Sequence, residues 1–197
     1  MLGQLSKDYL LKMDQYIKSN LGTITCGEVR DCYQSFIDIS IGLTGIHSNY
    51  KSLPEYIIHR FLYYLCEQQI SNRQYGIITN KQFLNKYGGK NELDIALVIP
   101  NEQGNKVDEP KVIKGISIKA AKEVDIDLDS HRANNLIWGT NKNLNIVLVT
   151  FNDKFKINPE EYIHEQYKII NLDKERGEVF AHELKKKLNL SQGDCCF

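Results

Sequence analysis

The chain has no net charge and no long hydrophobic run. Its 197 residues include 25 lysines and arginines and 25 aspartates and glutamates, which cancel. A bulk electrostatic attraction to nucleic acid is therefore excluded, and any DNA-binding surface must be a local patch. No stretch of about 18 apolar residues occurs, so the sequence predicts no transmembrane helix. The N-terminal segment lacks the charged and then apolar layout of a signal peptide, and we expect a cytoplasmic protein.

Cysteine is scarce, odd in number and poorly spaced for a structural role. The five residues are Cys26, Cys32, Cys66, Cys195 and Cys196. None of them belongs to a CxxC pair, which argues against a disulfide framework and against a structural zinc site. The five histidines are scattered, without the spacing of a zinc site or of a Ser–His pair. No glycine-rich phosphate loop is present, so we expect no nucleotide cofactor.

The sequence alternates between helical and extended patterns. Apolar residues recur at helical spacing over 6–19, 28–37, 52–70, 130–138 and 175–190, and a further helix should begin at Asn158. Short apolar runs predict strands over 75–79, 93–99, 112–119, 144–151 and 167–170. These patterns predict a single α/β domain, residues 1–197, whose central mixed sheet of about four to five strands is flanked by helices. It divides into an N-terminal helical region (1–50), a core (52–151) and C-terminal helices (158–197).

An acid and a lysine stand at the ends of two neighbouring predicted strands. Asp94 lies near the start of the first strand, and Ser117 and Lys119 share one face at the end of the second. A carboxylate and an ammonium at the end of a twisted sheet can hold a divalent cation and a water beside a phosphate. That is the minimum for metal-assisted hydrolysis of a phosphodiester. A salt bridge at a partly buried edge explains these residues equally well.

This arrangement resembles the PD-(D/E)xK nuclease superfamily, which includes type II restriction endonucleases and Holliday junction resolvases. The resemblance covers residues 52–151 and rests on Asp94, Lys119 and the order helix, three strands, helix, strand. It implies an αβββαβ core that cleaves double-stranded DNA with Mg2+ or Mn2+. By resemblance Asp94 is a metal ligand, Lys119 positions or polarises the attacking water, and the carbonyl of Ile118 completes the metal's shell. The preceding helix often carries another acid, a place that Glu55 could fill.

The sequence departs from the family pattern at two positions. Leu93 stands where the family has proline, and Ser117 stands where it usually has Asp or Glu. Some restriction endonucleases with SxK recruit a carboxylate from a neighbouring helix instead. Here Glu92, on the same strand face as Asp94, or Glu123, in the acidic run 123–129, could replace it, although solvated acids in an extended segment explain both.

Glu55 has a second explanation that is independent of metal binding. Ser52-x-x-Glu55 matches a capping box, in which serine and glutamate satisfy each other's backbone N–H groups at a helix start. The metal and capping interpretations are equally well supported by the sequence.

Two polar segments are candidates for DNA contact. The stretch 80–90 and the helix after Ser130 supply side chains that can bond phosphates or base edges, namely Lys81, Lys86, Lys90, Arg132, Asn134 and Asn135. An ordinary polar loop and a solvated helix face explain each residue as well. The favoured role is a type II restriction endonuclease acting as a homodimer on a palindromic site. The alternatives are a structure-selective nuclease such as a junction resolvase, and a catalytically inactive DNA-binding relative.

Overall fold

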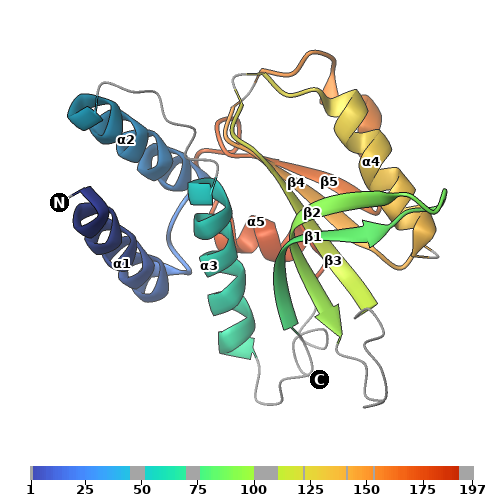
Figure 1. Ribbon diagram of the computed structural model, residues 1–197, viewed down its shortest axis with the longest axis horizontal. Helices are drawn as coiled ribbons and strands as arrows, with labels where there is room; N and C mark the ends of the chain where they lie inside the picture. Colours follow the sequence, from blue (N-terminus) through green and yellow to red (C-terminus); the bar gives the residue numbers. More distant parts are fainter. Residues whose placement is uncertain are drawn as a thin grey trace.

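Three helices precede a five-stranded sheet in this chain (Figure 1). The computed structural model describes residues 2–44, 52–69, 76–99, 111–121, 123–140, 142–152 and 154–190. The helices are α1 (Leu2–Asn20), α2 (Cys26–Thr44), α3 (Ser52–Gln69), α4 (Ile126–Gly139) and α5 (Phe180–Lys187), with a 3-10 turn η1 at Pro159–Tyr162. The strands are β1 (Gly76–Leu84), β2 (Lys90–Ile99), β3 (Lys111–Lys119), β4 (Asn145–Thr150) and β5 (Tyr167–Asn171).

The strands form one mixed sheet in the order β1-β2-β3-β4-β5. Neighbours from β1 to β3 are antiparallel, whereas β4 and β5 run parallel to β3. This confirms the predicted α/β class. Strand β4, between β3 and β5, is almost wholly buried, because helices cover both faces of the sheet. Its run of β-branched and apolar residues suits that position.

Each face of the sheet belongs to a separate hydrophobic cluster. On one face Ile95, Ile116 and Val149 pack with residues of α1, α2, α3 and α5. On the other face Val98 and Leu148 pack with residues of α4. Figure 1 shows the same division, with α3 and α5 on one side of the strands and α4 on the other. The start of β2 and the end of β3 are thus enclosed between α3 and α4. The predicted site residues Asp94 and Lys119 lie in these parts of the two strands.

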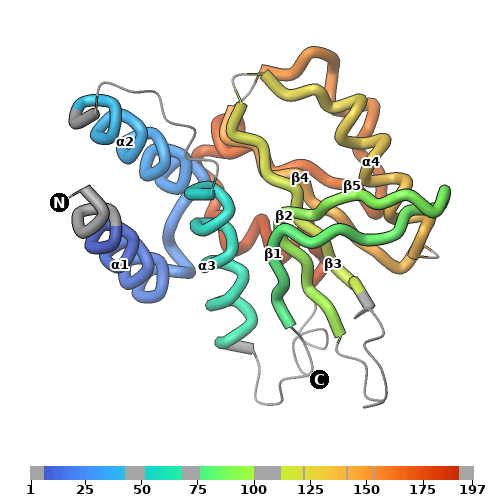
Figure 2. Tube along the Cα trace, in the orientation of Figure 1, coloured from blue at the N-terminus to red at the C-terminus, as the bar shows by residue number. Residues whose placement is uncertain are grey.

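Several predicted boundaries were wrong. Only residues 85–89 of the stretch 80–90 form a turn, because β1 continues to Leu84 and pairs with β2 down to Lys90. Figure 2 shows this hairpin extending to a turn beside α4. The predicted helix at Asn158 is only the 3-10 turn η1, and the last helix begins at Phe180 rather than near residue 175. Residues 172–177 form turns instead, in which the backbone N–H of Glu175 donates to the carbonyl of Asn171 and the N–H of Glu178 to the carbonyl of Glu175, both at 2.9 Å.

The acidic run 123–129 was misinterpreted as extended throughout. Its first residues are, but Asp125 is the N-cap of α4 and its side chain accepts a hydrogen bond from the backbone N–H of Leu128 (3.3 Å). The helix therefore starts at Ile126, four residues before Ser130. Asp127 and Asp129 lie in its first turn, where their negative charges interact favourably with the helix dipole.

Some sequence-based expectations fall outside the described residues. Cys195 and Cys196 are among them. Cys26, Cys32 and Cys66 carry free thiols. Within the described ranges, no helix is both long enough and apolar enough to cross a membrane.

Candidate functional site

Asp94 lies where β2 and β3 stop pairing. The two strands pair as far as Ile95 and Ile116. One residue further, the Oδ2 atom of Asp94 accepts hydrogen bonds from the backbone N–H of Ile118 (2.5 Å) and from the hydroxyl of Ser117 (3.3 Å). A side-chain carboxylate thus replaces the backbone acceptor that a continued ladder would supply. Both bonds use Oδ2, and among the described residues no hydrogen bond or ion pair reaches Oδ1, which could therefore bind a ligand where the strands separate.

Strand β1, the other neighbour of β2, is also distorted opposite Asp94. Thr79 and Lys81 of β1 pair with Ile95 and Leu93, but Asn80, opposite Asp94, has a φ of 50°. Non-glycine residues rarely adopt positive φ, and asparagine tolerates it better than most. The side-chain amide of Asn80 donates a hydrogen bond to Oε2 of Glu55 (3.1 Å). This hydrogen bond connects the first turn of α3 to the edge strand of the sheet, beside Asp94.

The pKa of Asp94 is raised above its usual value. Burial is the main cause, and the negative charge of Glu55 adds to it. The N–H of Ile118, the ammonium of Lys119 and the hydroxyl of Ser117 oppose the rise. The two carboxylates and the ammonium are therefore close enough to influence one another, and a carboxyl with a raised pKa gains from a cation placed beside it.

Lys119 has an acidic partner that the sequence did not predict. Its Nζ lies 3.1 Å from Oδ1 of Asp129 in the first turn of α4, and the Asp129 side chain is only 11% exposed. Glu123, the acid proposed from the sequence to compensate for Ser117, is exposed. The sequence places Asp129 in the acidic run, but its contact with Lys119 depends on how α4 packs across the ends of the strands.

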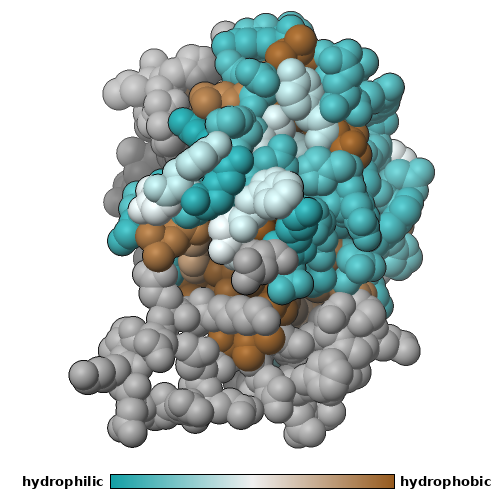
Figure 3. Space-filling view, turned by 90° about the vertical axis from the view of Figure 1, so that its right-hand side faces the viewer, coloured by the Kyte–Doolittle hydropathy of each residue, from teal (hydrophilic) through white to brown (hydrophobic). Residues whose placement is uncertain are grey.

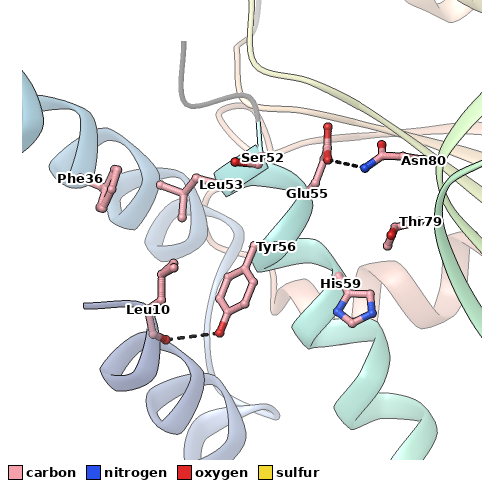
Figure 4. A pocket seen from close by; sticks show the side chains of 9 residues that line it. All are labelled: Leu10, Phe36, Ser52, Leu53, Glu55, Tyr56, His59, Thr79 and Asn80. Carbon is pink, nitrogen blue, oxygen red and sulfur yellow. Dashed lines mark hydrogen bonds between the residues drawn. The ribbon is translucent and has the colours of Figure 1, made fainter. Parts of the chain in front are cut away.

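Glu55 also borders a pocket of about 470 Å3 between α1, α2, α3 and β1 (Figure 4). One side of the pocket is apolar, formed by Leu10, Phe36, Leu53 and Tyr56, and the other is polar, formed by Ser52, Glu55, His59, Thr79 and Asn80. In Figure 4 Glu55 points away from the apolar side and toward Asn80. Burial, with the nearby charge of Arg60 as a smaller cause, lowers the pKa of His59, which keeps its imidazole neutral at pH 7. Ser52 is the first residue of α3, and the described hydrogen bond of the Glu55 side chain is with Asn80.

The acidic donors at this site suit a magnesium ion that retains several waters. Magnesium usually binds one or two carboxylates and completes its octahedron with water and substrate phosphate oxygens. Asp94 and Glu55 supply two such carboxylates. The backbone of Ile118, whose N–H donates to Asp94, lies next to them and offers its carbonyl oxygen. Glu92 is exposed at the start of β2 and pairs across the strand with Gln82. Within the described ranges, no three histidine, cysteine, aspartate or glutamate side chains are grouped to hold a metal by themselves.

The six residues predicted to contact DNA differ in solvent exposure and in their contacts. Lys86, Lys90 and Arg132 are exposed, and Lys81 is half-buried. The Oδ1 atom of Asn134 lies 2.7 Å from Nε2 of His164. Asn135 is only 7% exposed, so we withdraw it as a base-reading residue. It lies on the inner side of α4, where the backbone of the β1–β2 turn packs against it.

Comparison with known proteins identifies no relative. No protein-family model, curated protein or solved structure matches this chain.

Proposed function

We propose that this protein is a metal-dependent endonuclease that hydrolyses phosphodiester bonds of double-stranded DNA. The observation that supports it best is the position of Asp94, whose half-buried carboxylate lies where β2 and β3 separate and interacts electrostatically with Glu55 and Lys119. The competing explanation, a salt bridge at a partly buried edge of the sheet, would pair Asp94 directly with Lys119. Instead the described ion pair of Lys119 is with Asp129, and Asp94 shares its surroundings with a second carboxylate.

Each residue of the site has a distinct role in this proposal. Asp94 and Glu55 hold Mg2+ or Mn2+, and the backbone carbonyl of Ile118 is a third oxygen donor. When bound, the ion supplies charge stabilisation at the phosphate and lowers the pKa of the attacking water. Lys119 orients that water, and Asp129 holds the ammonium of Lys119 in place. The hydroxyl of Ser117 fixes the carboxylate of Asp94 (3.3 Å) rather than binding the ion.

The biological role proposed first is that of a type II restriction endonuclease acting as a homodimer. Two-fold symmetry would match the symmetry of a palindromic target. A structure-selective nuclease is the second candidate, and an exposed aromatic surface on the β1–β2 hairpin, described below, favours it. A catalytically inactive DNA-binding relative is the remaining alternative, because Ser117 replaces an acid.

The direct test is digestion of supercoiled plasmid by the purified protein in Mg2+ and in EDTA. We expect nicked or linear products in Mg2+ or Mn2+ and none in EDTA. Lys119→Ala should lose cleavage but keep DNA affinity in a gel shift with Ca2+, since the lysine acts on the water rather than on binding. Absence of both cleavage and duplex binding at low salt would overturn the proposal.

A further inference from the structure

Two aromatic side chains are strongly exposed at one end of the molecule. Tyr87, in the β1–β2 turn, is 72% exposed, and Trp138, in the last turn of α4, is 53% exposed. A lysine ammonium lies over each ring, Lys86 at 4.6 Å from the Tyr87 centroid and Lys142 at 3.9 Å from the Trp138 centroid. Each of these two large exposed rings is therefore paired with a cation.

The turn and the end of α4 are joined into one surface. The backbone N–H of Lys86 donates to the carbonyl of Asn135 (3.1 Å), and the amide of Asn91 donates to the carbonyl of Arg132 (3.2 Å). Gly139 permits this contact, since a Cβ there would lie 3.0 Å from the backbone of Asn85. These contacts therefore hold together the two backbone segments that carry the rings.

The turn itself is held by one side chain. The Oδ1 atom of Asn85 accepts hydrogen bonds from the backbone N–H groups of Tyr87 and Gly89, both at 3.0 Å. This arrangement leaves little conformational freedom to the backbone that carries Tyr87. A fixed aromatic side chain loses less entropy on binding than one on a mobile loop.

Positive charge surrounds the two rings. Lys86 and Lys142 lie over them, and Lys90 and Arg132 are exposed on the adjoining strand and helix. Two exposed acids adjoin it: Glu92, two residues after Lys90, and Glu165, next to Gln166, whose side-chain amide donates to the carbonyl of Lys142. The side of the molecule shown in Figure 3 is largely hydrophilic, with isolated hydrophobic patches rather than a broad apolar surface. An apolar protein partner would have to bury the ammonium groups without counter-charges, which is costly, whereas phosphates would neutralise them.

We infer that this surface, formed by Lys86, Tyr87, Trp138 and Lys142, binds a single-stranded segment of DNA. Bases stack on the two rings, and the ammonium groups contact the backbone phosphates. Stacking requires an open base face, which a continuous duplex does not offer along its length. The inference rests on the proposed nuclease function and specifies its substrate as duplex DNA adjoining unpaired nucleotides, the kind of substrate that the second candidate, a structure-selective nuclease, would cut.

The turn that carries Tyr87 is connected to Asp94 by the first residues of β2. β2 leads from Lys90, beside the turn, to Asp94. Four strand residues span about 13 Å, comparable to about four stacked nucleotides at 3.4 Å each. Unpaired nucleotides on the rings would thus lie a few positions from the phosphate proposed to be cut.

Trp138 provides its own probe, because it is the only tryptophan in the chain. Titration of the full-length protein with oligo(dT) in EDTA, which prevents cleavage, should quench its fluorescence. A blunt duplex of equal length should quench it much less, and a duplex with an oligo(dT) overhang should quench as oligo(dT) does. Tyr87→Ala should weaken the apparent affinity for oligo(dT) by about fivefold or more, in line with the loss of one stacked base. The matched control is Tyr16→Ala, an exposed tyrosine on α1 (50% exposed), which should leave it unchanged.

Each result decides the inference. Equal quenching by blunt duplex and oligo(dT), no quenching at all, or equal weakening by Tyr87→Ala and Tyr16→Ala would overturn it. Absent quenching together with Mg2+-dependent plasmid cleavage would reject this surface but retain the proposed nuclease. Quenching without cleavage would retain the surface and reject the nuclease.

Discussion

At the scale of single residues, Asp94 combines properties that favour ligand binding over stability. Its carboxylate is half-buried, and burial together with Glu55 raises its pKa. The favourable bonds from Ile118 and Ser117 only partly offset these effects. A buried carboxylate with a raised pKa lowers the free energy of unfolding of the metal-free protein at neutral pH. Binding of a cation beside it would restore that stability.

The first prediction concerns the stability of the Asp94→Asn variant without metal. Because the folded pKa of Asp94 lies above its unfolded value, the folded state binds more protons between the two values, and the free energy of unfolding falls as pH rises through that interval. The variant removes this charge and keeps an acceptor for the Ile118 N–H. It should therefore be more stable than wild type at pH 7 in urea denaturation, with the advantage shrinking as pH falls toward about 3.9, the usual aspartate value. A less stable variant at pH 7 would show that the hydrogen bonds outweigh burial.

The second prediction separates Asp129 from Glu123. Asp129→Asn should lower the single-turnover cleavage rate about tenfold or more, because Lys119 loses the partner that holds its ammonium 3.1 Å away. DNA affinity in Ca2+ should stay the same or rise, since one negative charge is removed. Glu123→Gln is the control and should cleave at the wild-type rate. Equal rates for both variants would leave Asp129 without a role in positioning Lys119.

At the scale of elements, the sequence predicted what depends on local periodicity. The apolar runs of β2, β3 and β4 and the helical spacing of α1 and α3 gave the correct order and the mixed sheet. Period-two alternation also placed Ser117 and Lys119 on one face. The hairpin was missed because Asn80, Asn85 and the glycines after Tyr87 are turn residues, and only pairing with β2 shows that the chain remains extended there.

What could not be predicted depends on contacts between elements. Asp129 lies beside Lys119 only because α4 packs across the ends of the strands. Asn135 is buried for the same reason, although its sequence neighbours Arg132 and Asn134 are accessible to different extents. The positive φ of Asn80 leaves no periodic signal either.

The third prediction addresses the start of α3, where metal binding and capping assign different roles to Glu55. If Glu55 is a metal ligand, Glu55→Gln should collapse the cleavage rate with little change in melting temperature. If it serves the helix cap, Glu55→Gln and Ser52→Ala should each lower stability by about 1 kcal/mol and leave cleavage largely intact. The bond from Asn80 to Glu55 favours the first outcome. Equal destabilisation with full activity in both variants would leave only the cap.

At the scale of the whole molecule, two helical layers enclose a sheet whose strand ends bring separate parts of the chain together. Glu55 comes from α3, Asp94 from β2, Ser117 and Lys119 from β3, and Asp129 from α4. The charge of the chain cancels overall, so binding of DNA would depend on where the charges lie. The exposed lysines and rings of the hairpin and of α4 are one such local concentration.

The most direct measurement is the single-turnover cleavage rate of a labelled DNA substrate as a function of Mg2+ concentration, for wild type and for Asp94→Asn. Circular dichroism should first establish that the variant is folded. We expect a saturable Mg2+ dependence for wild type and a rate at least about a hundredfold lower for the variant at every concentration, since loss of a direct ligand should exceed the cost of losing an outer-shell group. Cleavage by Asp94→Asn at the wild-type rate with the same Mg2+ dependence would contradict the proposed site.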